Sequence, residues 1–157
     1  MQPRWDTLPF AALTTDTLYA IMRLRQEVFI VEQDSAYLDA DGADLEATHL
    51  LCREGDKLIA YQRMLGPGIR YPESSIGRIV VAPSLRGQDL GRELVRRGIA
   101  HNVEQWPGID ICISAQAHLE PFYGALGFTG EGDVYDEDGI PHRKMRYRAN
   151  QWPTKLA

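Results

Sequence analysis

The stretch RIVVAPSLRGQDLGRELV, residues 78–95, has the residue types of an anion-binding site. Its first half, rich in β-branched residues, predicts a strand, and the apolar and charged spacing of its second half predicts a helix. The first turn of a helix leaves backbone N–H groups without partners, and the helix dipole adds partial positive charge there. Gly87 and Gly91 let phosphate oxygens approach the backbone, and Arg86 adds a charge-assisted contact. We therefore expect a diphosphate at this helix start.

The usual nucleotide and metal motifs do not fit this sequence. It has no Gly-x-x-x-x-Gly-Lys-Ser/Thr motif and no Gly-x-Gly-x-x-Gly after a first strand, which excludes a P-loop and a Rossmann turn. Gly-x-x-x-Gly at a helix start also occurs for packing alone, so that alternative stays open. Residues 39–46 resemble a calcium loop, but the glycine is at its fourth position instead of its sixth. Scattered histidines and distant cysteines have no zinc spacing, and we predict no metal.

The remaining sequence predicts the elements that must position this motif. Helices are expected at residues 14–33, 88–106 and 119–127. Strands are expected at residues 3–8, 47–55, 57–66, 76–83, 110–117 and 133–148, the last of these a hairpin around Asp138-Gly139. In the first helix Arg25 adds only its stem to the apolar stripe. The order predicts an α/β fold with a mixed sheet and one parallel βαβ unit at its centre.

Composition indicates one globular domain, residues 1–157 with a core of about 5–148. Apolar residues make up 44% of the chain and charged residues 25%. The net charge of −5, without an aromatic-interleaved basic stripe, argues against a nucleic-acid partner. Without a long apolar run or a signal-peptide pattern, we expect no membrane partner and a cytoplasmic location. Cys52 and Cys112 fall within expected strands and are predicted to be reduced core thiols.

Acidic residues concentrate in two stretches, 39–46 and 131–139. Their glycines and aspartates predict loops. Acidic loops beside an active site would favour a cationic or amine-bearing substrate, with salt screening the effect. Solvated loops without that role are the alternative.

The stretch VVAPSLRGQDLGRELV resembles the coenzyme A signature of the GCN5-related N-acetyltransferases (GNAT), Arg/Gln-x-x-Gly-x-Gly/Ala after a strand. Asp89 stands where that pattern has its first glycine. FYGALGF, residues 122–128, is similar to the family's second signature, and LRQEVFIVEQ, AQAHLEPFY and YDEDGIPH are similar to the small bacterial ElaA-type branch. The resemblance covers about residues 15–148. It implies a centrally splayed β-sheet flanked by helices, the acyl-CoA N-acyltransferase fold.

The resemblance also implies acetyl-CoA as cosubstrate. Its pantetheine would lie like an extra strand between strands 76–82 and 110–116, where amides of Ile79, Val80 and Val81 bind it and polarise the thioester carbonyl. Gln116 occupies the position of a cofactor-contacting asparagine in many relatives. The expected diphosphate-binding residues are Arg86, Gly87, Gln88, Asp89, Leu90, Gly91 and Arg92.

Tyr123 is the expected catalytic group, because a phenol can stabilise or protonate the thiolate that leaves when an amine attacks the thioester. An aromatic residue that only packs the short helix is the alternative, and Phe122 and Phe128 are expected to do that. The attacking amine must also lose a proton. Because the strand of the first signature has no acid, we expect His118 or Glu32 as base or substrate anchor, ahead of His49 and His142.

The sequence therefore predicts an enzyme: an N-acetyltransferase of the EC 2.3.1 type that transfers an acetyl group from acetyl-CoA directly to an amine in a ternary complex. The acceptor is a small-molecule amine or a protein amine, and a homodimer is left open. The alternatives are an acyltransferase like the acyl-homoserine lactone synthases, a noncatalytic CoA-sensing module, and a protein–protein adaptor with an empty cleft.

Overall fold

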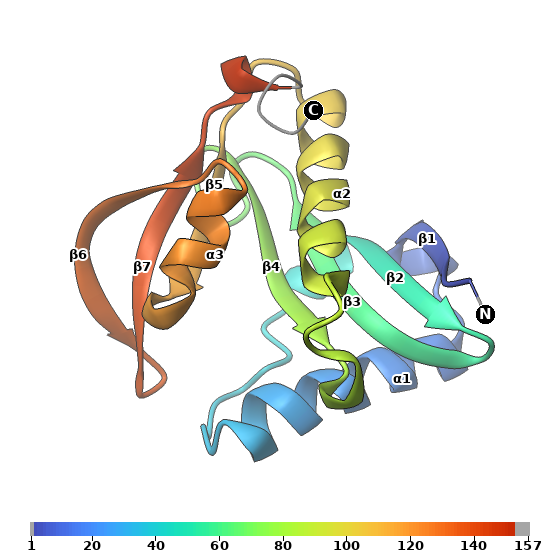
Figure 1. The fold of residues 1–157 in the computed structure, drawn as a ribbon. Coiled ribbons are helices and arrows are strands. Elements are labelled where there is room, and N and C mark those ends of the chain that lie inside the picture. Colours follow the sequence, from blue (N-terminus) through green and yellow to red (C-terminus); the bar gives the residue numbers. More distant parts are fainter. Residues whose placement is uncertain (1, 153–157) are drawn as a thin grey trace.

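A seven-stranded sheet in the order β1-β2-β3-β4-β5-β7-β6 organises the computed structural model, which describes residues 2–152 (Figure 1). The helices are α1 (Thr15–Arg25), α2 (Leu90–Gln105) and α3 (Glu120–Ala125). The strands are β1 (Arg4–Pro9), β2 (Thr48–Glu54), β3 (Lys57–Leu65), β4 (Ser74–Val81), β5 (Ile111–Gln116), β6 (Thr129–Glu137) and β7 (Ile140–Tyr147). The prediction of a mixed α/β sheet is confirmed.

The strand pairing follows the turn residues of the sequence. β2 and β3 form the expected hairpin at Gly55-Asp56, and β6 and β7 form the second hairpin at Asp138-Gly139. Gly55 and Gly139 both have positive φ, which glycine adopts without steric cost. β1 pairs antiparallel with β2 and is an edge strand, as predicted.

The central pair, β4 and β5, is parallel and makes contact at one end only. Its register consists of Ser74 with Ile111 and Ser75 with Cys112, after which the strands separate. The side chain of Asn102 in α2 is fully buried behind this contact and donates to Ser74 Oγ at 3.2 Å and to the Ser75 carbonyl at 3.0 Å. The sheet is therefore splayed at its centre, as the resemblance implied, and the joined end is fixed by α2.

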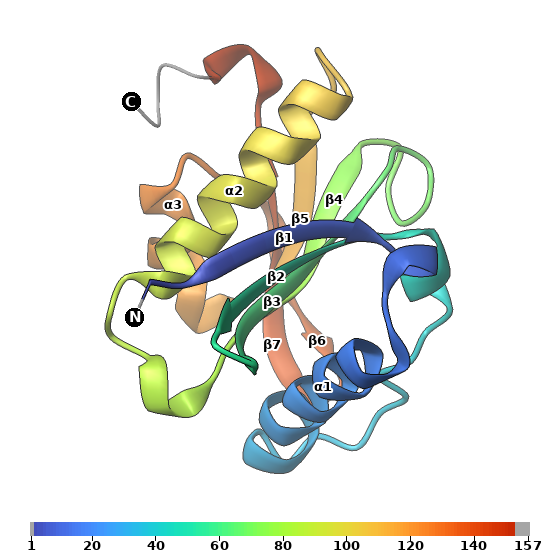
Figure 2. The same ribbon diagram turned by 90° about the vertical axis from the view of Figure 1, so that its right-hand side faces the viewer.

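Helices cover both faces of the sheet, with α2 and α3 on one face and α1 on the other (Figure 2). Two apolar cores result. The larger lies beneath α2 and α3, and the smaller lies beneath α1. Leu50 and Leu51, neighbours in β2, point into different cores because successive strand residues face opposite sides. The inner stripe of α2 matches the predicted one: Leu94, Val95, Gly98, Ile99, Asn102 and Val103 are buried.

The expected first helix, 14–33, differs in its second half. α1 ends at Arg25, and residues 26–32 continue as π-helical turns. Hydrogen bonds five residues apart mark this widening, from Gln33 N to Val28 O at 3.1 Å and from Ser35 N to Ile30 O at 3.1 Å. π-Helical turns occur often at functional sites, and this one borders a cavity.

The acidic stretch 131–139 is mostly strand, in agreement with the hairpin predicted at 133–148, and the loop predicted from its glycines and aspartates is limited to the turn at Asp138-Gly139. Residues up to Glu137 belong to β6 and pair with β7. The register of β6 and β7 shifts between Glu131 and Tyr135, where Gly132 has a φ of 74°. Gly132 therefore lies in a β-bulge and not in a turn.

Cys52 and Cys112 are free, buried thiols, as predicted. Burial raises the pKa of each to about 11, which keeps them protonated and unreactive. Within residues 2–152, none of the helices is both long and apolar enough to traverse a bilayer.

Candidate active site

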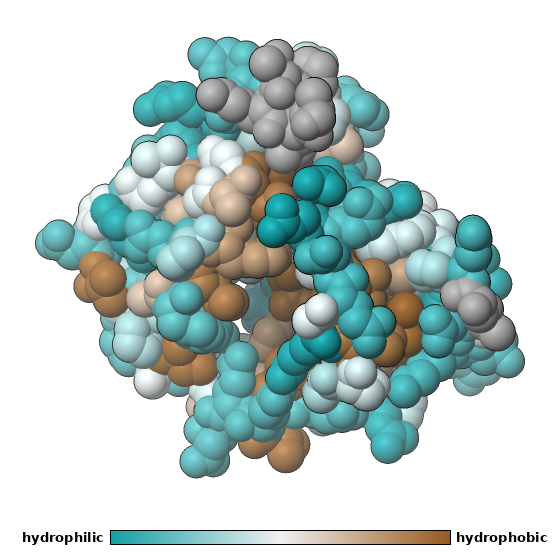
Figure 3. Space-filling view, viewed as in Figure 1, coloured by the Kyte–Doolittle hydropathy of each residue, from teal (hydrophilic) through white to brown (hydrophobic). Residues whose placement is uncertain are grey.

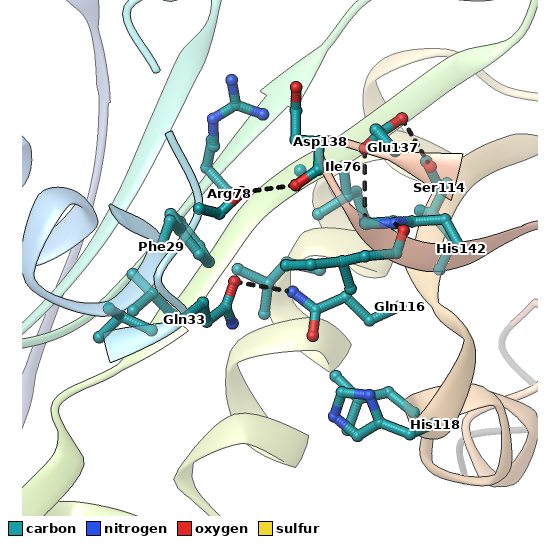
Figure 4. Close-up of a pocket in the computed structure, with 18 of the residues that line it drawn as sticks. Phe29, Gln33, Ile76, Arg78, Ser114, Gln116, His118, Glu137, Asp138 and His142 are labelled. Atoms are coloured by element: carbon teal, nitrogen blue, oxygen red, sulfur yellow. Dashed lines mark hydrogen bonds and ion pairs between the residues drawn. The ribbon is translucent and has the colours of Figure 1, made fainter. Parts of the chain in front are cut away.

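A cavity of about 680 Å³ occupies the gap where β4 and β5 separate. One wall comes from the π-helical turns, residues 33–37 and β4, and the other comes from β5, α3 and the β6–β7 hairpin. Figure 3 shows a hollow near the centre of the molecule with apolar side chains around it. Figure 4 shows the side chains that line the cavity. Both halves of the sheet therefore contribute to one site.

β4 carries a β-bulge beside this cavity. The pairing of β3 with β4 changes register between Tyr61 and Arg63, so β4 has an extra residue there. Arg78 lies at this point with a φ of 52°, in the left-handed region. Bulges bend a strand and leave backbone groups unpaired. Because β5 pairs with β4 only at the other end of the strand, residues 79–81, which include the expected amide donors, border the cavity with β3 on one side and no strand on the side of β5.

The start of α2 has the open backbone that the sequence predicted. Gly87 has a φ of 83°, and a Cβ added there would meet no atom within 4 Å. Asp89 is the N-cap residue with a φ of 61°, and its side chain makes no capping hydrogen bond. The N–H groups of the first turn of α2 therefore have no side-chain cap and remain free to bind an anion.

Arg86 and Glu32 form a two-pronged ion pair at the edge of the cavity. Arg86 Nη1 and Nη2 each donate to one carboxylate oxygen of Glu32 at 2.6 Å, and both side chains are partly exposed. These hydrogen bonds lower the pKa of Glu32, so its carboxylate is a weaker base than an unpaired one. A diphosphate that binds the Arg86 guanidinium must therefore displace the Glu32 carboxylate from it.

Tyr123 lies in α3 with its side chain against the cavity and only 6% exposed. Its ring packs edge-on against Phe122 and Phe128, with centroids 5.1 and 5.9 Å away. Burial alone raises the pKa of Tyr123 well above the usual value for a phenol. The hydroxyl is therefore protonated at neutral pH and available as a hydrogen-bond donor.

Gln116 is the last residue of β5, His118 lies two residues later in the 3-10 turn Ala117–Leu119, and both line the cavity. Gln116 Nε2 donates to Gln33 Oε1 at 3.1 Å, which links β5 to the segment after the π-helical turns (Figure 4). Ser35 Oγ makes a second link by donating to the carbonyl of Asp138 at 2.7 Å. These two hydrogen bonds cross between the halves of the sheet where the strands have separated.

A second polar group lies on the side of the β6–β7 hairpin. His142 Nε2 is 3.4 Å from Glu137 Oε2, and Glu137 Oε1 accepts from Ser114 Oγ at 3.1 Å (Figure 4). Arg70 also donates to Glu137 Oε1 at 3.1 Å. All four residues line the cavity.

The three aspartates of the acidic stretch 39–46 are paired with arginines, and no residue of this stretch is among those that line the cavity. Asp39 and Asp44 are 7% and 5% exposed, and their carboxylates are bound by arginines. Arg25 donates to Asp39 at 2.8 Å and to Asp44 at 2.7 Å, and Arg63 donates to Asp41 at 2.6 Å. The set is called here the ion cluster: Arg25, Arg63, Arg78, Asp39, Asp41 and Asp44. Its formal charges cancel, three against three.

Sequence comparison identifies the family. A family model described as an acetyltransferase (GNAT) domain matches residues 19–149. The chain belongs to the GNAT family. A UPF0039 protein from Synechocystis is 43% identical over 149 residues, which cover 94% of this chain and 97% of that protein.

Two solved GNAT-fold structures are similar over almost the whole chain. The crystal structure of Escherichia coli ElaA has a TM-score of 0.88 at 37% identity and covers 94% of this chain and 100% of its own. An acyl-CoA N-acyltransferase from Pseudomonas aeruginosa has a TM-score of 0.88 at 40% identity and covers 93% of this chain and 99% of its own. This chain therefore lies in the ElaA-like branch of the GNAT family and has the acyl-CoA N-acyltransferase fold.

The structure of this GNAT chain brings the expected residues 79–81, Arg86, Gln116, His118, Tyr123 and Glu32 around one cavity. Sequence reasoning did not identify the pairing of Glu137 with His142. The only sequence signal was their position on either side of the Asp138-Gly139 turn, where hairpin partners come close. Among the described residues, no group of three or more His, Cys, Asp or Glu side chains is arranged to hold a metal ion.

Proposed function

We propose that this protein is an acetyl-CoA-dependent N-acetyltransferase that transfers the acetyl group directly to an amine within a ternary complex. The observation that carries the proposal is the separation of β4 from β5 after two residue pairs. It leaves residues 79–81 beside a cavity that Arg86 and Tyr123 also line. The family and fold support an acyltransferase, and the polar and apolar groups of the cavity support this reaction.

The residues that would hold the cofactor lie in the second half of β4, at the start of α2 and at the end of β5. Amides of residues 79–81 donate to the pantetheine and to the thioester carbonyl, where they stabilise negative charge on its oxygen during attack. The open first turn of α2, together with Gly87 and Arg86, binds the diphosphate. Gln116 borders the same channel at the end of β5.

The transfer step needs few groups. The amine nitrogen attacks the carbonyl carbon, a C–N bond forms, and the nitrogen loses one proton to a base. The C–S bond breaks, and its electron pair goes to sulfur. A thiol ionises at lower pH than a phenol, and burial raises the pKa of Tyr123 further. The Tyr123 hydroxyl therefore stabilises the leaving thiolate by donating a hydrogen bond, and solvent then supplies the thiol proton.

Thermal unfolding with CoA tests the cofactor site. A ligand that binds only the folded protein stabilises it by about 2.7 kcal/mol at one hundred times its dissociation constant. Gly87→Glu places a carboxylate in the open space where the diphosphate is expected and should abolish the CoA-dependent shift in melting temperature. Release of free thiol from acetyl-CoA, screened over a panel of amines, then tests the transfer itself.

Gly108→Glu is the matched control. Gly108 also has a positive φ, 79°, and a Cβ there also meets no atom within 4 Å, but it lies beyond the other end of α2. Both variants thus have the same backbone cost, and only Gly87→Glu should lose CoA stabilisation. Equal CoA-dependent shifts in the two variants would contradict the diphosphate assignment.

A further inference from the structure

His142 is held in one orientation by its own strand. It lies in β7 and is 7% exposed, opposite Gln116 of β5 and Tyr135 of β6 in the strand register. Its Nδ1 lies 2.7 Å from the carbonyl oxygen of Ile140. Its ring stacks on Tyr135 with an interplanar angle of 26°. The ring therefore has a fixed face and a fixed edge towards the cavity.

The Ile140 contact decides which nitrogen takes part in proton transfer. A carbonyl oxygen only accepts, so Nδ1 carries a hydrogen and donates it. Nε2 is then the nitrogen that gains and loses a proton. It lies 3.4 Å from Glu137 Oε2, longer than an ordinary hydrogen bond, so this pair leaves the Nε2 lone pair uncommitted while the ring is neutral.

Glu137 is itself positioned for this partner. Its Oε1 accepts from Ser114 Oγ and from Arg70, both at 3.1 Å, which leaves Oε2 towards His142. Its side chain is 32% exposed. A carboxylate in this place stabilises the positive charge of an imidazolium that forms at Nε2.

Other ionisable groups surround the pair from every neighbouring element. Tyr135 of β6 stacks on the imidazole, and Arg70 from the β3–β4 connection reaches Glu137. Tyr71 of that connection is close enough to Tyr135 and Glu137 to interact electrostatically. Across the cavity the remaining charged or ionisable lining residues are Glu32, Tyr37, Arg78, Arg86, His118, Tyr123 and Asp138.

The other candidate bases are less suited by their contacts. Glu32 is bound at both oxygens by Arg86. His49 is fully buried, with one nitrogen on the Asp44 carbonyl and the other on Tyr61. Among residues 2–152, the His118 side chain makes no hydrogen bond that would fix its tautomer.

We propose that His142 Nε2 is the base that takes the proton of the attacking amine, with Glu137 as its positioning residue. The inference rests on the proposed acetyl transfer. As the neutral amine forms its bond to the carbonyl carbon, one N–H proton passes to Nε2 and the electron pair of the C–S bond leaves with sulfur. Glu137 stabilises the imidazolium, which then releases its proton to solvent, while the thiolate takes one from solvent.

The test compares pH profiles of thiol release from acetyl-CoA with ethanolamine, glycinamide and spermidine as acceptors. His142→Asn keeps an N–H donor for the Ile140 carbonyl and removes the proton-accepting nitrogen. It should lower kcat/KM by about 10²- to 10⁴-fold. It should also remove the decline of the rate at low pH, the acidic limb of the profile, that occurs at the same pH for all three amines. A limb caused by protonation of the amine shifts with the pKa of the amine, so the two causes can be separated.

Glu137→Gln should lower kcat about tenfold and displace the same limb, an effect that a purely structural role would not produce. His101→Asn, a matched change in α2 outside the cavity, should leave rate and profile unchanged. An unchanged profile in His142→Asn, or loss of the limb in His118→Asn instead, overturns the inference while the proposed function stands.

Two measurements separate the inference from the proposed function. CoA should stabilise His142→Asn and the wild type equally, and a wild type without CoA stabilisation defeats the proposed function and the inference together. Nitrogen NMR of the imidazole, independent of any acceptor, should show Nδ1 protonated and Nε2 bare in the neutral ring. The opposite tautomer refutes the assignment.

Discussion

The ion cluster and the Glu137–His142 pair both place carboxylates beside nitrogen-bearing side chains, but their hydrogen-bonding groups are used to different extents. In the ion cluster each aspartate is bound by arginine, Arg25 is completely buried, and the formal charges cancel. In the cavity, His142 Nε2 has a carboxylate neighbour at 3.4 Å and an uncommitted lone pair. The paired carboxylates of the ion cluster stabilise the fold. The Nε2 lone pair of His142 is held in place but has no hydrogen-bond donor among the residues that the structure describes, so it is available for chemistry.

Breaking the ion cluster should have the largest effect on stability. Arg25→Met removes a guanidinium that donates to Asp39 and Asp44 and leaves buried negative charge behind. The free energy of unfolding should fall by about 3 kcal/mol, measured by urea denaturation. Arg4→Met is the control, because Arg4 pairs with Asp6 on the surface and should cost less than about 1 kcal/mol. Equal losses would mean that the cluster is not structural.

Tyr123→Phe tests the cavity side of the comparison. It keeps the ring between Phe122 and Phe128 and removes only the hydroxyl. We expect kcat and kcat/KM to fall together by about 100-fold, roughly 3 kcal/mol of barrier, with CoA affinity and stability retained. Because burial raises the pKa of Tyr123, any decline in wild-type rate from its ionisation should lie above the usual phenol range. A near-normal kcat would show that Tyr123 only packs.

Two groups in or beside the ion cluster should make stability depend on pH, and the first is His49. His49 donates Nε2–H to the Asp44 carbonyl at 2.9 Å, and burial lowers its pKa below 6.5. Below that pH His49 binds a proton in the unfolded chain but not in the folded protein. The free energy of unfolding therefore falls as pH falls from about 6.5, by up to about 1.4 kcal/mol per pH unit. His49→Gln should abolish this first loss in urea titrations at different pH values, and His101→Gln should retain it.

A second loss in the same titrations should remain in His49→Gln. Hydrogen bonds from Arg63 hold the pKa of Asp41 far below its usual 3.8, so this group stabilises the fold above about pH 4. Its contribution disappears as the carboxylate is protonated at lower pH. A wild type whose stability does not change between pH 7 and pH 3 would contradict both assignments.

The smallest effect is expected for Asp89→Gly at the cofactor side of the cavity. Relief of the left-handed backbone at φ 61° is offset by the greater freedom of glycine in the unfolded chain, so stability should change by less than about 1 kcal/mol. CoA should bind about two- to fivefold more tightly once the carboxylate is gone, measured by calorimetry. Asp34→Gly makes the same exchange at φ 50° and should leave CoA affinity unchanged. Weaker CoA binding in Asp89→Gly would show that the aspartate has a useful contact.

Features encoded locally could be predicted from sequence. The Gly55-Asp56 and Asp138-Gly139 turns, the inner stripe of α2 and the open glycine turn before it all depend on neighbouring residues. The resemblance supplied the splay of β4 from β5, which no local pattern shows.

Features that depend on distant partners could not. Arg25 was assigned to an apolar stripe by its stem, but its charge is neutralised by aspartates 14 and 19 residues away. The burial of Asp39 and Asp44 therefore departs from the solvated loop that the stretch 39–46 predicts. His142 cannot be distinguished from the other histidines by sequence, because its tautomer and its position at the cavity depend on three strands that come together only in the folded chain.

The separated strands also determine how the empty cavity opens. Asn102 fixes the joined end of β4 and β5, and the hydrogen bonds Gln33–Gln116 and Ser35–Asp138 join residues 33–35 to β5 and to the β6–β7 turn across the cavity. Each such bond contributes about 0.5–1.5 kcal/mol net, so breaking both costs roughly 1–3 kcal/mol. A cost of this size predicts an open form at roughly 1–20% of the population at equilibrium. Acceptors can therefore select a form that already exists, and their entry does not have to force the sheet apart.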